Sequence, residues 1–263
     1  MAALPVILIF DAGRTNKKVL LFDEDYRVVH EESVQLAETV DEDGDPCEDV
    51  HGLTSWIRNT LSRLLQKEEF SVRAINFSGY GASFVCTDSL LNPVLPLYNY
   101  LKPFPAELQE KFYLTYGGQD EFSRQTCSPV LGSLNSGMQL YRLKHERPEM
   151  FSEIRYALHL PQYLSAIVTG KPFSEITSIG CHTNLWHFRN NQYHPWVARE
   201  GLESILPPIT SSHSVVMMDN MVVGAGLHDS SSALIPYLKN FTEPFVLLST
   251  GTWSISLNPF NSK

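Results

Sequence analysis

The chain has 263 residues, of which 43% are hydrophobic, so it can bury a substantial core in one large domain or two small ones. Its net charge of −9 argues against nucleic acid as the main ligand, because a phosphate backbone attracts clustered Lys and Arg. Residues 2–10 are apolar but too few to cross a bilayer, and no basic flank precedes them, so they predict a buried strand and no membrane partner. Four widely spaced cysteines without a C-x-x-C pair predict reduced thiols and a cytoplasmic protein.

The first third of the chain predicts three strands in succession, at Val6–Phe10, Lys18–Phe22 and Arg27–Gln35. Large apolar residues at helical spacing then predict a helix over Asp49–Lys67. The acidic run Asp41–Asp49 between them predicts a solvated loop, and its spacing makes it a poor calcium site.

Helical and strand patterns continue to alternate, which favours an α/β architecture. We expect a strand at Val72–Phe77, paired with Phe84–Thr87, and then irregular structure or short helices over Leu95–Val130. The remaining expected elements are helices at Ser136–His145 and Gln162–Thr169, the latter capped by Gly170, an extended segment at Ile154–Leu160, strands at Val215–Met218 and Met221–Val223, and a helix from near Ser230.

Two stretches, Val6–Asp23 and Phe245–Leu257, repeat one pattern of apolar strand, tight Gly/Thr turn and second apolar strand. Such a turn directs several backbone N–H groups at one point, as a bound phosphate requires. Gly/Thr turns also simply close β-hairpins, but Asp11 beside the first turn and the later second copy favour a phosphate site. A phosphate held between two such hairpins implies a nucleotide in a cleft between two related domains.

The segment Gly224–Leu234 leads from a Gly-rich strand exit into Asp229, which Ser230 and two further serines follow. This order is typical of an N-cap at the start of a helix. The helix dipole keeps a carboxylate there ionised. Such a carboxylate can accept a proton from a hydroxyl that attacks a phosphate.

Several other sites are not supported. Neither G-x-G-x-x-G nor G-x-x-x-x-G-K-[ST] occurs, and there is no G-x-S-x-G. The group Cys181, His182, His187 and His194 matches no familiar zinc spacing. The strand and helix order instead suits the actin-like nucleotide-binding fold.

Five segments carry a resemblance to a known family: Asp11–Lys18 (DAGRTNKK), Ile75–Phe84 (INFSGYGASF), Leu160–Thr183, Leu227–Ala233 (LHDSSSA) and Ser249–Ser254 (STGTWS). With them, the chain resembles the N-terminal half of an FGGY-family carbohydrate kinase, nearest the rhamnulokinase and fuculokinase branch. The resemblance implies an α/β actin-like ATPase (ribonuclease H-like) domain, with a mixed sheet flanked by helices. Residues 1–240 would form the sugar-binding and phosphate domain, and residues 241–263 the opening strands of a second, truncated domain that binds the nucleoside.

The resemblance also implies ATP-dependent phosphorylation of a sugar hydroxyl, with a ketose or deoxyketose of the rhamnulose, fuculose or xylulose type as substrate and Mg²⁺ as cofactor. Asp229 falls on the catalytic base, and Asp11 on the aspartate that positions the metal through water. The ATP phosphates would contact Asp11, Gly13, Arg14, Thr15, Asn16 and Lys18 at the first turn, and Gly251 and Thr252 at the second. Gly81, Ser83, His228 and Ser230 would bind the sugar.

The chain departs from the family pattern at several positions. Arg14 and Asn16 stand where the family usually has a small residue and a hydroxyl, and Arg14 either adds a phosphate contact or crowds the turn. Ser83 stands where the rhamnulokinase branch usually has an aspartate, so the sugar is not named. An alternative is a non-catalytic sugar-binding or regulatory protein, and a third is an actin- or chaperone-like ATPase, which the His228–Asp229 pair disfavours. A homo-oligomer remains open.

Overall fold

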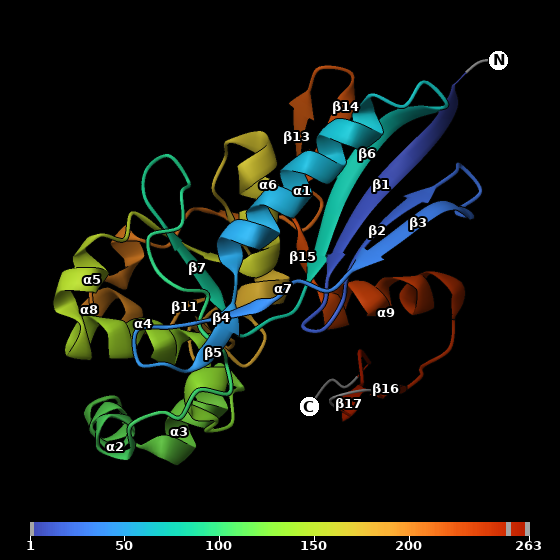
Figure 1. The fold of residues 1–263 in the computed structure, drawn as a ribbon. Helices are drawn as coiled ribbons and strands as arrows, with labels where there is room; N and C mark the ends of the chain where they lie inside the picture. The colour runs from blue at the N-terminus through green and yellow to red at the C-terminus, as the bar shows by residue number, and fades with distance from the viewer. Residues whose placement is uncertain (1–2, 251–253, 261–263) are drawn as a thin grey trace.

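The computed structural model describes residues 3–250 and 254–260. Its centre is a seven-stranded mixed sheet (Figure 1). The strands are, across the sheet, β13 (Val215–Met218), β14 (Met221–Gly224), β6 (Phe70–Gly79), β1 (Leu4–Ala12), β2 (Lys17–Phe22) and β3 (Val28–Val34), with β15 (Leu227–His228) also on β6. The first three strands form the expected antiparallel meander, while β1, β14 and β15 all run parallel to β6. The expected strands of this sheet are confirmed.

Two helices cover one face of the sheet. Helix α1 (Val50–Leu65) begins at Asp49, whose carboxylate accepts the Gly52 N–H at 2.9 Å, as an N-cap does. Helix α6 (Leu160–Thr169) lies beside it, and the Thr54 and Tyr163 hydroxyls meet at 2.6 Å between the two. Gly170 ends α6 at φ 69°, a left-handed conformation that glycine adopts without strain, as the sequence predicts.

Alternation along the strands assigns each side chain to a face. In β1 Val6, Leu8 and Phe10 are buried beneath α1, whereas Asp11 lies on the opposite face. In β2 the buried positions are Lys17, Val19 and Leu21, so the core face of this strand begins with a charged residue.

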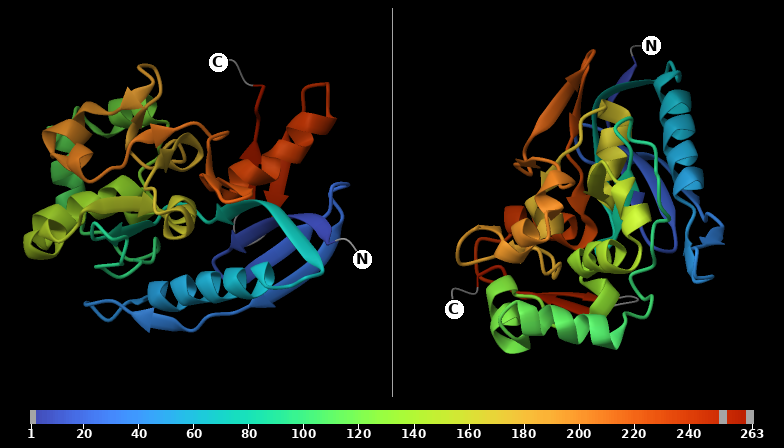
Figure 2. Two further views of the ribbon diagram at one scale, coloured as in Figure 1. Left: turned by 90° about the horizontal axis from the view of Figure 1, so that it is seen from above. Right: turned by 90° about the vertical axis from the view of Figure 1, so that its left-hand side faces the viewer.

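A second lobe, formed by residues between β6 and β13 in the chain, lies beside the sheet (Figure 2). It has its own hydrophobic core around Phe112 and Trp196. Its elements are β7 (Phe84–Thr87), α2 (Ala106–Thr115), α3 (Gln119–Thr126), α4 (Ser136–Glu146), α5 (Pro148–Ser152), β8 (Tyr156–His159), β9 (Ser174–Glu175), α7 (Ile176–Ile179), β10 (Trp186–His187), β11 (Gln192–Tyr193), α8 (Pro195–Arg199), β12 (Ile209–Thr210) and two 3₁₀ turns at Gly132–Leu134 and Leu202–Ser204. The expected short helices before Val130 and the helix at Ser136–His145 are confirmed.

The expected pairing of Phe84–Thr87 with β6 is wrong. Strand β7 pairs with β8 instead, Phe84 opposite His159. The chain leaves the main sheet after Gly79, and Ala82 has φ 61°, so β7 is turned away from β6 and into the second lobe.

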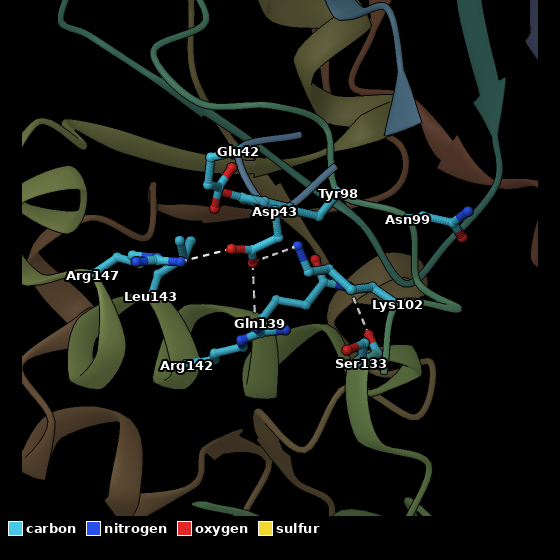
Figure 3. Close-up of a pocket in the computed structure, with 10 residues that line it drawn as sticks. All are labelled: Glu42, Asp43, Tyr98, Asn99, Lys102, Ser133, Gln139, Arg142, Leu143 and Arg147. Atoms are coloured by element: carbon cyan, nitrogen blue, oxygen red, sulfur yellow. Dashed lines mark hydrogen bonds and ion pairs between the residues drawn. The ribbon is translucent and has the colours of Figure 1, made fainter. Parts of the chain in front are cut away.

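The acidic run is the expected solvated loop only at residues 42–44, which form an exposed turn. It forms a hairpin of β4 (Glu38–Val40) and β5 (Pro46–Glu48), in which Asp41 and Glu48 are buried. The Lys102 ammonium lies 2.5 Å from Asp41, 2.9 Å from Asp43 and 3.2 Å from Asp45. Arg142 and Arg147 also reach Asp43 (Figure 3). Cations from a distant part of the chain therefore stabilise a run that repels itself in isolation.

The C-terminal segment is less buried than the rest. Helix α9 (Asp229–Asn240) begins where the sequence predicts, but none of its residues is buried. Strands β16 (Leu247–Thr250) and β17 (Ser254–Leu257) form the expected second hairpin as a separate two-stranded sheet below α9 (Figure 1). Among the residues that the structure describes, no helix is long and apolar enough to cross a membrane.

Candidate functional site

Three parallel strands end together at one edge of the sheet. Asp11 of β1 lies opposite Ser78 of β6, and Ser78 lies opposite Leu227 of β15. The Ser78 hydroxyl also lies 3.3 Å from the Ser232 hydroxyl of α9. This register brings the end of β1 next to the start of α9, at the carboxyl edge where α/β sheets bind ligands.

Asp229 is the first residue of α9. The N-cap is His228, so the N-cap assignment of Asp229 is wrong by one residue. Its carboxylate accepts the Ser230 N–H at 2.6 Å and the Ser230 hydroxyl at 3.2 Å, and 38% of the side chain is exposed. The exposed part leaves the carboxylate open to a ligand.

Asp11 and Asp229 are close enough to influence each other. Burial raises the pKa of Asp11, a hydrogen bond from Ser78 opposes the rise, and the negative charge of Asp229 adds to it. A cation bound here would relieve this repulsion. Mg²⁺ fits the donor set, since it usually binds one or two carboxylates and takes its other ligands from phosphates and water. Within residues 3–250 and 254–260, no three or more His, Cys, Asp and Glu side chains cluster as a metal site, so the remaining ligands would have to come from substrate and water.

The first turn, residues 13–16, joins β1 to β2 next to Asp11. It is tight, because a Cβ on Gly13 would lie 3.0 Å from the Asn16 carbonyl oxygen. Thr15 and Asn16 are exposed. The Arg14 guanidinium pairs with Glu38 at 2.5 Å, and the Lys18 ammonium pairs with Glu31 at 3.1 Å. Arg14 lies in the turn and Lys18 just after it, and each is paired with a carboxylate of another strand.

His228 and Gly81 are in direct contact. A Cβ on Gly81 would lie 2.3 Å from His228 Nε2, so this approach requires glycine. The Thr177 hydroxyl accepts the His228 N–H at 3.0 Å, while the ring Nδ1 is buried without a partner among the described residues. Burial lowers the pKa of His228, although Asp229 opposes the shift. The ring is therefore neutral at pH 7, with one nitrogen able to donate and the other to accept a hydrogen bond.

Other predicted site residues use their polar groups within the protein. The Ser83 hydroxyl is buried and donates to the Tyr98 carbonyl at 3.2 Å. The Ser230 hydroxyl faces Asp229, as given above. Gly251 and Thr252 lie outside the described residues. The roles of these four residues in ligand binding stay predictions.

Sequence reasoning missed three residues behind the first turn, namely Lys17, Glu48 and Tyr80. Lys17 pairs with Glu48 at 2.6 Å, and the Tyr80 hydroxyl donates to Glu48 at 2.9 Å. One signal was present, because Lys17 shares the two-residue period of the buried Val19 and Leu21. Nothing in the sequence distinguishes Glu48 from the other carboxylates of the acidic run Asp41–Asp49.

His159 and His182 were also missed as neighbours of His228. Burial lowers the pKa of His159 to about 3, with smaller effects from His228 and His182. His187 and His194 instead stack on each other with ring centres 5.5 Å apart. His182 therefore lies near His228, whereas His187 and His194 lie together elsewhere.

The mixed sheet and its flanking helices have the actin-like α/β fold. The family model for the N-terminal domain of the FGGY family of carbohydrate kinases matches residues 6–235. The chain belongs to this family.

Individual relatives are consistent with this family assignment. A rhamnulokinase from Halalkalibacterium halodurans is 24% identical over 92% of the chain, which spans 52% of that relative. The crystal structure of a carbohydrate kinase from Novosphingobium aromaticivorans superposes with a TM-score of 0.84 at 26% identity, covering 97% of this chain and 56% of that one. The xylulose kinase of Rhodospirillum rubrum has the same fold, with a TM-score of 0.77 at 17% identity, covering 92% and 52%. The chain thus spans about half the length of the relatives it matches.

Proposed function

We propose that the protein is an ATP-dependent sugar kinase that acts on a ketose or deoxyketose. The observation that carries this proposal is an exposed carboxylate, Asp229, beside a second carboxylate, Asp11, and a tight turn at one edge of the sheet. The names of the relatives, rhamnulokinase and xylulose kinase, support the substrate class.

In the proposed reaction Asp229 accepts the proton of a sugar hydroxyl as that oxygen attacks the terminal phosphorus of ATP. The bond to the bridging oxygen breaks, and the products are a sugar phosphate, ADP and a proton. The turn at residues 13–16 would bind the phosphates through its N–H groups. Asp11 would hold Mg²⁺, which neutralises phosphate charge when bound.

His228 would orient the sugar. Its neutral ring can hydrogen-bond a hydroxyl in either direction, and Gly81 lets the loop backbone approach the ring closely. Positioning of this kind, with charge neutralisation and one oriented base, accounts for most catalysis of phosphoryl transfer.

The test is Asp229→Asn in the full native gene product, with ADP release measured over a panel of ketoses. We expect turnover to fall by about 10²- to 10⁴-fold, as for loss of a general base, while sugar affinity measured by calorimetry changes little. Ser231→Ala is the matched control, since it lies in the same first turn of α9, has no assigned role in binding and keeps the Asp229 carboxylate. Unchanged turnover in Asp229→Asn would contradict the assignment of Asp229 as the general base.

A non-catalytic sugar-binding protein is the second candidate. It is favoured by the ion pair between Arg14 and Glu38, because a guanidinium already bound to a carboxylate is less able to bind the phosphates of ATP. It predicts calorimetric sugar binding by the native protein without ATP binding or ADP release.

A further inference from the structure

A buried ion pair lies directly behind the first turn. The Lys17 ammonium is 2.6 Å from Glu48, and their side chains are only 3% and 4% exposed. Charged groups at this depth are destabilising unless they are paired and fully hydrogen-bonded. A gain in stability therefore does not by itself account for the pair, and its other contacts indicate a role.

Lys17 also binds the turn itself. Its ammonium donates to the Gly13 carbonyl at 3.0 Å and to the Arg14 carbonyl at 3.2 Å. With Glu48, these acceptors use all three of its N–H groups. In a trans peptide the N–H points away from the C=O, so drawing two carbonyls inward directs the N–H groups of Arg14 and Thr15 outward. Outward N–H groups are what a phosphate-binding turn requires.

The second carboxylate oxygen of Glu48 contacts the loop at residues 79–83, which contains the predicted sugar-binding residues Gly81 and Ser83 and is called the sugar side below. The Tyr80 hydroxyl donates to Glu48 at 2.9 Å, and Tyr80 immediately precedes Gly81. The Tyr80 backbone N–H also donates to the Ala12 carbonyl at 3.2 Å, at the entrance to the turn. Burial raises the pKa of Tyr80 well above its usual value, and Glu48 raises it further, so this hydroxyl stays protonated and donating.

The hairpin that carries Glu48 is held at both ends. Glu48 forms a bridge to Leu97, and the hairpin tip is fixed by Lys102, Arg142 and Arg147 through Asp43 (Figure 3). Since these contacts come from the second lobe, they fix Glu48 relative to both lobes.

We propose that Glu48 is a positioning residue shared by the two halves of the site. Through Lys17 it shapes the phosphate turn, and through Tyr80 it sets the loop at residues 79–83. The role rests on the proposed function, but the contacts that define it exist in the ligand-free protein and are measured there.

The experiment is amide hydrogen exchange of the ligand-free native protein in four variants. Glu48→Gln weakens both arms, Tyr80→Phe removes the sugar-side arm, and Lys17→Met removes the turn-side arm. The double variant Lys17→Met/Glu48→Gln removes the turn-side arm without leaving a lone buried charge. Thr54→Val is the control, because it breaks a buried hydrogen bond between α1 and α6, away from the turn.

We expect Glu48→Gln to speed exchange about 3- to 10-fold, the equivalent of one hydrogen bond, both at Ala12 and Lys17, whose pairing closes the turn, and at Tyr80, whose N–H donates to the Ala12 carbonyl. Tyr80→Phe should affect chiefly Tyr80, whereas the double variant, which includes Glu48→Gln, should affect both places and the turn more strongly than Glu48→Gln alone. Exchange unchanged in both places, or raised uniformly over the sheet as in Thr54→Val, would overturn the proposal. If Glu48→Gln fails to fold, Tyr80→Phe and the double variant decide by the same criterion.

The same variants separate this proposal from the proposed function. In turnover assays we expect the double variant to raise the KM for ATP and Tyr80→Phe to raise the KM for the sugar, each more than it lowers kcat. If the wild-type protein shows no turnover, the proposed function fails, while the exchange pattern still tests the role of Glu48.

Discussion

The two hairpins share a sequence pattern, yet they differ in what surrounds them. Strand β1 lies between β2 and β6 and beneath α1, and its Leu8 is fully buried. Among the described residues, β16 pairs only with β17, and its Leu248 is 69% exposed. An apolar strand, a Gly/Thr turn and a second apolar strand therefore specify a hairpin, but burial depends on what packs against it. The first hairpin is part of the main core, whereas the second has largely exposed apolar side chains among the described residues.

The largest expected contrast is in hydrogen exchange. Amides of β1 should exchange at least about 10³-fold more slowly than those of β16, because opening β1 requires disruption of the main sheet, whereas β16 opens locally. Exchange measured by NMR or mass spectrometry checks this. Equal protection would show that the second hairpin is held by contacts absent from the described structure.

Matched truncations test the same contrast in free energy. Leu8→Ala should lower the free energy of unfolding by about 2–5 kcal/mol, since it leaves a cavity in the core. Leu248→Ala should change it by less than about 0.5 kcal/mol, as is usual at exposed positions. Urea unfolding of both variants provides the measurement, and similar losses in the two would contradict the comparison.

Asp11 lies beside the turn of the first hairpin, and the described residues of the second hairpin include no such carboxylate. When ionised, Asp11 should lower the free energy of unfolding of the protein. Because its pKa in the folded protein is raised above 3.8, its contribution to stability is present below that value and is lost as pH rises through the raised pKa. Asp11→Asn should therefore stabilise the protein at pH 7, and the gain should shrink as pH falls toward 3.8. Thermal unfolding across this pH range tests the prediction, and a less stable Asp11→Asn protein at pH 7 would refute it.

The smallest effect concerns the link between the meander and α1. Arg63 donates two hydrogen bonds to Glu32 of β3, at 2.8 and 2.5 Å, and this contact lowers the pKa of Glu32 to about 2. The pair is partly exposed, so Arg63→Ala should cost no more than about 1 kcal/mol. The loss should diminish in about 1 M salt and as pH falls toward 2, where Glu32 becomes protonated.

Arg58→Ala, at an exposed arginine of the same helix, is the control. A loss in Arg63→Ala that is insensitive to salt would indicate lost packing rather than a lost ion pair.

Much of the fold could be predicted because its signals are local. Periodicity locates β1, α1 and α4, and Gly170 marks the end of α6. The order of the strands and the segments around Asp11 and Asp229 indicate the FGGY family. These features depend on neighbours along the chain, so the sequence alone determines them.

Tertiary structure decided what depends on distant partners. Strand β7 pairs with β8 because the chain turns out of the sheet after Gly79, and no short-range pattern encodes that choice. Asp41 can be buried in the acidic hairpin because Lys102 pairs with it, while Arg142 and Arg147 pair with Asp43, all from more than fifty residues away. Likewise the contact of Gly81 with His228, and the sharing of Glu48 by Lys17 and Tyr80, join segments that only the folded chain brings together. Local propensity sets the elements, while packing and charge compensation between remote segments set the pairing, the burial and the site.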